Sequence, residues 1–95
     1  MRLTASQIEI IRQAARQNFG AGASVWLFGS RVDDARRGGD VDLYIEPVRE
    51  STLMSELRCK ITLEDSLDLH VDLIVKGPGK EKPIYQIAKT QGIQL

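Results

Sequence analysis

The sequence has little of several residue types, and each shortage argues against a class of protein. Only one of the 95 residues is a cysteine, Cys59, which excludes an internal disulfide and a zinc site built from several thiolates. No apolar run has the length of a signal peptide's core or a membrane span, so we expect a cytoplasmic protein with no membrane partner. Lysine plus arginine equals aspartate plus glutamate at 13 each, whereas strong nucleic-acid binding is usually driven by a basic excess.

The residues that are present are those of an ordinary globular protein. Hydrophobic residues make up 42% of the chain and charged residues 27%. The length predicts a single domain over residues 1–95, with a modest hydrophobic core. Cys59 falls within a stretch of periodic apolar residues, and we expect it to be a packed core residue rather than a nucleophile.

Apolar periodicity predicts helices and strands in alternation. The predicted helices cover residues 4–18, 31–37, 51–66 and 83–91, and the predicted strands cover residues 24–28, 40–45 and 69–75. We expect an α+β fold in which a small mixed β-sheet has helices packed on one face. The first helix begins with a capping box made either by Thr4 and Gln7 or by Ser6 and Glu9. In the 51–66 helix we expect Leu53, Leu57 and Ile61 on the buried side.

Three aspartates stand on predicted strands with apolar neighbours. Asp40 and Asp42 are two residues apart, so both side chains leave the same face of the strand, roughly 6.5–7 Å apart at their roots. Asp72 occupies the same place in a second Val-Asp-Leu triplet. If the apolar residues of both strands face one core, the three carboxylates share the opposite face, and they favour Mg²⁺ or Mn²⁺ over zinc. Taken alone, an Asp-x-Asp pair is more often simply part of a solvated strand face, and the turn upstream is needed to favour a metal site.

A Gly-Ser turn precedes the acidic strand. Gly29 and Ser30 come where a buried strand gives way to a predicted helix N-terminus. Backbone N–H groups and a hydroxyl at such a turn can cradle phosphate oxygens, and glycine permits close approach. Ser30 could equally act only as the helix cap with Asp33.

Gly29-Ser30, nine intervening residues, Asp40-Val41-Asp42 and the later Asp72 together resemble the DNA polymerase beta-like nucleotidyltransferase superfamily. The short chain looks most like the minimal nucleotidyltransferases, or MNT proteins, which are commonly antitoxins of a HEPN-domain partner. The resemblance implies a nucleotidyltransferase fold over nearly the whole chain.

The resemblance also implies roles for individual residues. Gly29 and Ser30 would contact the triphosphate, with Arg31 nearby. Asp40 and Asp42 would bind Mg²⁺ or Mn²⁺, while Asp72 would complete the metal site and help to deprotonate the attacking hydroxyl. Arg36, Arg37 and His70 have no settled role. The arginines could pair with the nucleotide or form a solvated helix face, and His70 could support the metal site or lie exposed at a strand end.

The implied activity is transfer of a nucleoside monophosphate, AMP from ATP, to a hydroxyl acceptor on a HEPN toxin. The alternative is a non-catalytic antitoxin that neutralises its partner by masking it, and either function allows assembly into a homo- or hetero-oligomer. All three carboxylates are retained, which favours chemistry because masking does not require them. A small-molecule nucleotidyltransferase is disfavoured because so short a chain leaves little surface for an acceptor pocket.

Overall fold

A mixed four-stranded sheet forms the centre of the molecule. The computed structural model describes residues 3–29 and 40–95. Its elements are α1 (Ala5–Phe19), β1 (Ser24–Phe28), β2 (Val41–Glu46), α2 (Leu53–Leu67), β3 (Val71–Val75), α3 (Pro83–Gln91) and β4 (Ile93–Gln94). The strand order is β3-β2-β1-β4, with β2 parallel to β3 and the other neighbours antiparallel. The α+β class and the mixed sheet are confirmed. The two-residue strand β4 is too short to show a period in the sequence.

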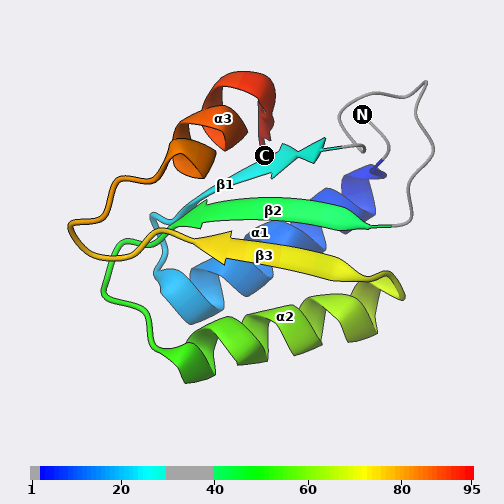
Figure 1. Cartoon of the computed structure of the whole chain (residues 1–95). Coiled ribbons are helices and arrows are strands. Elements are labelled where there is room, and N and C mark those ends of the chain that lie inside the picture. Colours follow the sequence, from blue (N-terminus) through cyan, green and yellow to red (C-terminus); the bar gives the residue numbers. More distant parts are fainter. Residues whose placement is uncertain (1–2, 30–39) are drawn as a thin grey trace.

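The strict alternation of β2 separates two cores. Val41, Leu43 and Ile45 are fully buried in the larger core, where α1 and α2 cover one face of the sheet. The intervening Tyr44 belongs to a smaller aromatic core on the opposite face, under α3. Figure 1 shows α3 on the other side of the sheet from α1 and α2. The one-face arrangement therefore describes α1 and α2, and α3 adds partial cover to the second face.

Aromatic stacking holds α3 in place. The ring centroids of Trp26 and Tyr44 are 5.5 Å apart, and those of Tyr44 and Tyr85 are 5.2 Å apart. Such offset contacts add to the stabilisation from burying the rings. Trp26 is buried, while Phe28 is partly buried against the same cluster.

Capping residues set where the long helices begin. Of the two alternatives for α1, the structure has Thr4 and Gln7, each side chain bonded to the other residue's backbone N–H. Thr52 and Ser55 repeat this arrangement at α2. No helix in the described part of the chain is both long and apolar enough to cross a membrane.

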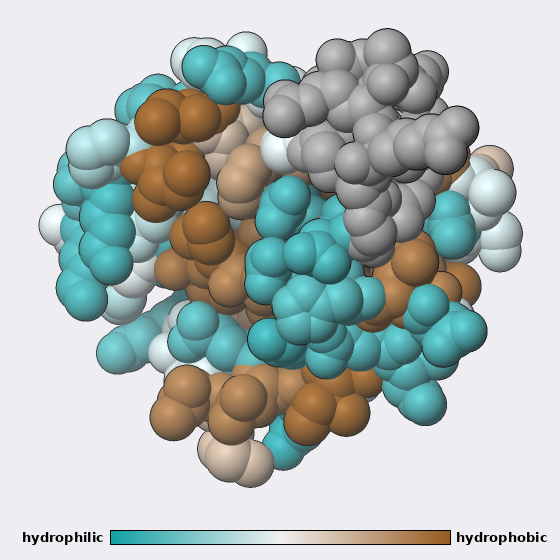
Figure 2. Space-filling model, turned by 45° about the vertical axis from the view of Figure 1, so that its right-hand side comes forward, coloured by the Kyte–Doolittle hydropathy of each residue, from teal (hydrophilic) through white to brown (hydrophobic). Residues whose placement is uncertain are grey.

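The buried side of α2 differs from the sequence prediction. Leu53, Leu57 and Ile61 are 71%, 44% and 64% exposed, so their predicted burial is wrong. The buried residues of this helix are Cys59, Leu63 and Leu67. Both sets recur every four residues, so periodicity alone could not decide which stripe meets the sheet. Figure 2 shows hydrophobic surface along the lower edge of the molecule, on the side of α2.

Cys59 lies within the main core, as expected. Its side chain is fully buried among the residues of α1, α2 and the sheet. Burial raises the pKa of its thiol to about 11, because the thiolate would lose its hydration. The thiol is therefore protonated at neutral pH, and Cys59 is a packing residue rather than a nucleophile.

Candidate functional site

Strand register brings the three aspartates together. The parallel pairing of β2 and β3 sets Asp42 opposite Asp72, so both side chains leave the same face of the sheet. The Val41 N–H donates to the His70 carbonyl over 2.9 Å, which ties the start of β2 to the start of β3. Asp40, just before β2, has a carboxylate oxygen within 4.8 Å of ligand atoms of both His70 and Asp72. The predicted convergence of the carboxylates is thus found in the structure.

Gly29 packs directly against this cluster. It follows β1, where Phe28 is paired with Asp42, and its φ of 77° lies in the left-handed region. A Cβ built on Gly29 would clash with the Asp42 carboxylate, and even the Asp42 Cγ would lie only 3.0 Å away. A side chain at position 29 would therefore displace Asp42 or the turn, so the close approach of backbone and carboxylate needs glycine.

Like charges make the cluster electrostatically costly. The pKa of Asp42 is raised first by partial burial, and then by the charge of Asp72, a hydrogen bond with the Asp72 carboxyl group and the charge of Asp40. His70 acts in the opposite direction and lowers it. Carboxylates that repel one another in this way are stabilised when a cation binds between them. Their oxygen donors suit a hard divalent ion such as Mg²⁺ or Mn²⁺, so the residues present fit such an ion.

The structure locates part of the predicted site. Gly29, Asp40, Asp42 and Asp72 lie together at one end of β2 and β3. Ser30 and Arg31, the other two predicted site residues, lie outside the described residues, as do Arg36 and Arg37. Figure 2 shows hydrophilic surface gathered at this end of the molecule.

Two residues of the site region, His70 and Glu64, were not assigned roles from the sequence. The His70 Nδ1 lies 3.0 Å from Glu64 Oε2, and its Nε2 lies 3.3 Å from Asp72 Oδ1. The same Glu64 oxygen accepts the Val71 N–H over 3.0 Å. Asp68 adopts the left-handed conformation that ends α2 and turns the chain into β3, which places Glu64 against the start of that strand. No motif marks Glu64, although its place one turn before the helix end could have suggested this contact.

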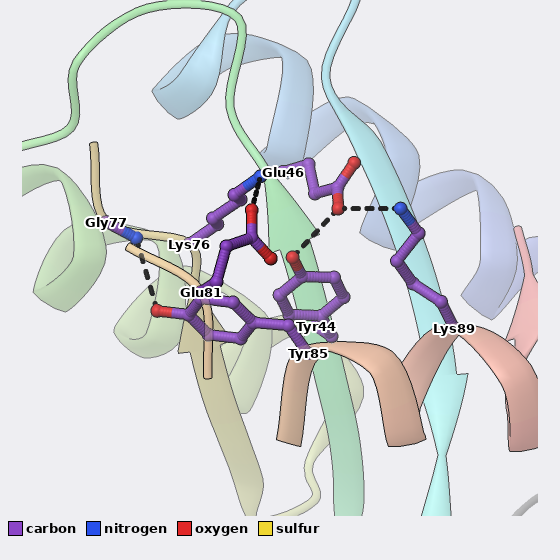
Figure 3. Close-up of polar contacts among 7 residues, drawn as sticks. All are labelled: Tyr44, Glu46, Lys76, Gly77, Glu81, Tyr85 and Lys89. Carbon is purple, nitrogen blue, oxygen red and sulfur yellow. Dashed lines mark hydrogen bonds and ion pairs between the residues drawn. The ribbon is translucent and has the colours of Figure 1, made fainter. Parts of the chain in front are cut away.

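The opposite ends of the same strands carry a polar network of another kind. The Tyr44 hydroxyl donates to Glu46 Oε2 over 2.9 Å, and Lys89 Nζ lies 3.1 Å from the same oxygen (Figure 3). The Tyr85 hydroxyl accepts the Gly77 N–H over 3.3 Å. These contacts link α3 to the sheet. A hollow of about 300 Å³ beside this end is lined by Pro47, Val48, Arg49, Glu50, Ser51, Lys76 and Pro78, and it includes none of the clustered aspartates.

Comparison with known proteins agrees with this arrangement. A family model described as a nucleotidyltransferase domain matches residues 8–93. No curated protein matches the chain. Among solved structures, the MntA–HepT toxin–antitoxin pair contains a chain that is 21% identical with a TM-score of 0.73, over 96% of this chain and 70% of that one.

Two further solved structures resemble the chain. A toxin–antitoxin structure with AMP-PNP matches at 22% identity and a TM-score of 0.76, over 97% of this chain and 72% of the other. A tri-AMPylated Shewanella oneidensis HEPN toxin in complex with an MNT antitoxin matches at 24% identity and a TM-score of 0.70, over 93% and 66%. At these identities the likeness establishes the fold. With the family match over residues 8–93, the chain belongs to the nucleotidyltransferase domain family.

Proposed function

We propose that this chain is an Mg²⁺- or Mn²⁺-dependent nucleotidyltransferase that transfers AMP from ATP to a hydroxyl of a HEPN-domain toxin, and so acts as its antitoxin. We further propose that residues 1–95 form one minimal nucleotidyltransferase domain acting in the cytoplasm. The observation that carries the proposal is the meeting of Asp42 with Asp72 directly beside Gly29, with Asp40 at the same end of the sheet.

Each residue of this cluster has a distinct part in the proposed reaction. Asp40 and Asp42 would hold the metal ions, beside the Gly29 turn at which the phosphates would bind. The absence of a side chain on Gly29 leaves its backbone open to the phosphates, with Ser30 and Arg31 following in the sequence as further phosphate contacts. Bound divalent ions would neutralise the charge of the triphosphate during in-line displacement, with pyrophosphate as the leaving group.

The exposure of Asp72 supports a role for it in activating the acceptor. It is the more exposed of the paired acids, with 51% of its side chain accessible, whereas Asp42 is partly buried. An incoming hydroxyl therefore reaches Asp72 more readily than Asp42. We assign to Asp72 the completion of the metal site and the acceptance of the proton from the attacking hydroxyl.

Two related structures support the choice of nucleotide and partner. One holds AMP-PNP, an analogue of ATP, and another pairs an MNT antitoxin with a HEPN toxin that carries three AMP groups. The Asp42–Asp72 face is open at the described residues, which is consistent with an acceptor hydroxyl supplied by a folded partner.

The test is transfer of label from ATP to the partner. The purified chain would be incubated with α-labelled ATP, Mg²⁺ and the product of the neighbouring gene, beside the Asp42→Ala variant and a Glu9→Gln control on the exposed side of α1. We expect label on the partner with the parent chain and the control. With Asp42→Ala the labelling rate should fall at least about 100-fold, since charge stabilisation is a large share of such catalysis.

The same experiment distinguishes the masking alternative. If the partner's toxic activity is suppressed equally by the parent chain and by Asp42→Ala, and no label is transferred, the chain acts by masking and the proposed chemistry is wrong. Suppression that requires both ATP and an intact Asp42 supports the transferase.

A further inference from the structure

Glu64, His70 and Asp72 form a continuous chain of contacts that ends at the metal site. Glu64 Oε2 receives the His70 Nδ1–H over 3.0 Å and the Val71 N–H over 3.0 Å. One oxygen of the Glu64 side chain, which is 30% exposed, makes both contacts, so the carboxylate is held beside Nδ1 of the imidazole. The other ring nitrogen, Nε2, faces Asp72 Oδ1 over 3.3 Å.

The contact with Glu64 determines what Nε2 can do. In a neutral imidazole one nitrogen carries the proton and the other presents a lone pair. With Nδ1 against Glu64, Nε2 is the nitrogen that faces the carboxylate cluster, and a neutral ring with its proton on Nδ1 presents a lone pair there. At 3.3 Å from Asp72 Oδ1, Nε2 is near enough to share a cation with that carboxylate.

This arrangement has the form of a metal-binding histidine. Metal-ligating histidines almost always donate their second N–H to a carboxylate or carbonyl, which fixes the tautomer and makes the ligating nitrogen more basic. Adjacent ligands of one octahedral ion, each about 2.1–2.2 Å from it, lie about 3 Å apart. The 3.3 Å between His70 Nε2 and Asp72 Oδ1 matches that separation, and an oxygen of Asp40 lies within 4.8 Å of both.

We propose that His70 Nε2 is a ligand of the metal ion at this site, beside Asp40 and Asp72, with Glu64 positioning the ring. The inference rests on the proposed function, because it takes a divalent ion at the carboxylates as given. It adds a selectivity that carboxylates alone do not provide. Imidazole suits first-row transition metals better than it suits Mg²⁺, so a His70 ligand shifts the preference of the site from Mg²⁺ towards Mn²⁺.

The test measures metal binding directly, without turnover. Binding of Mn²⁺ is followed by the electron paramagnetic resonance signal of the free ion, and Mg²⁺ affinity is obtained by competition. His70→Asn is the informative variant, because its amide nitrogen can still donate to Glu64 while the group at Nε2 is lost. Asp65→Asn, which changes an exposed carboxylate next to Glu64, is the matched control.

We expect the parent chain to bind Mn²⁺ at least about tenfold more tightly than Mg²⁺. His70→Asn should weaken Mn²⁺ binding at least about tenfold and Mg²⁺ binding by less than about threefold. Glu64→Gln should weaken Mn²⁺ binding by about tenfold, the lower end of the effect of removing a second-sphere partner. The Asp65→Asn control should bind both ions as the parent does.

Two outcomes would overturn parts of the argument separately. If His70→Asn binds Mn²⁺ as tightly as the parent, His70 is not a ligand, while the proposed transferase stands. If the parent binds neither ion, with or without ATP, the metal-dependent function itself is wrong.

Discussion

Replacing Asp42 with asparagine should stabilise the fold while it abolishes metal binding and transfer. The side chain keeps its shape and its place opposite Asp72, but it loses a charge that partial burial and neighbouring carboxylates make unfavourable. The residue that the proposed chemistry needs most is therefore one that the metal-free fold tolerates poorly.

The size of the effect follows from the geometry. Paired strands lie about 4.8 Å apart, and two unit charges at about 5 Å repel by about 3 kcal/mol at an effective dielectric constant near 20, or by about 0.8 kcal/mol in bulk water. The Asp72 side chain is 51% exposed, so solvent screening reduces the repulsion between Asp42 and Asp72 to about 1 kcal/mol. In a domain of 95 residues this corresponds to a rise in Tm of about 4–8 °C.

Differential scanning calorimetry in low salt with a chelator would measure this rise, with Glu9→Gln as the control. The raised pKa of Asp42 means that the folded chain binds this proton more tightly than the unfolded chain does. The charge therefore destabilises the parent fully above the folded pKa, and the penalty fades as the pH falls to the ordinary pKa of about 4. The advantage of the variant should be largest at neutral pH, and Mn²⁺ should raise the Tm of the parent much more than that of the variant. A Tm at or below that of the parent at pH 7 would refute the charge-repulsion argument.

Two other substitutions test the local geometry. In Gly29→Ala the new Cβ stands on a residue with a left-handed φ and clashes with the Asp42 carboxylate. In Gly79→Ala the φ of 65° is also left-handed, but nothing lies within 4 Å of the new Cβ. Urea unfolding should give a cost of about 1 kcal/mol for Gly79→Ala and a clearly larger one for Gly29→Ala, and equal costs would contradict the close approach. Leu63→Ala should cost about 2–5 kcal/mol and Ile61→Ala less than about 1, because only Leu63 is buried. The reverse order would restore the sequence-based assignment of the α2 face.

The part of the site that rests on strand alternation could be predicted from the sequence. A period of two fixes which side chains share a face, so Val41 and Leu43 had to oppose Asp42 once β2 was recognised. The same reasoning applied to Asp72 in β3. Alternation does not give strand register, and the pairing of Asp42 with Asp72 became visible only in the folded sheet.

The remaining features depend on information that periodicity does not carry. The α2 sequence offers two apolar stripes, and only the sheet decides that the one with Leu63 is buried. The contact between Glu64 and His70 depends on the left-handed conformation of Asp68, which no glycine marks. These are consequences of tertiary packing and turn geometry, and a single sequence does not record them.

The aromatic core under α3 also gives the protein a built-in optical reporter. Trp26 is the only tryptophan of the chain, and it packs against Tyr44 in a tilted contact, with Lys89 Nζ 5.4 Å from its ring centre. Its fluorescence therefore senses the docking of α3, while circular dichroism follows the helical content of the whole chain at once. Melting curves that coincide in both signals would identify a single cooperative unit, and an earlier change in fluorescence would reveal α3 detaching before the rest of the sheet comes apart.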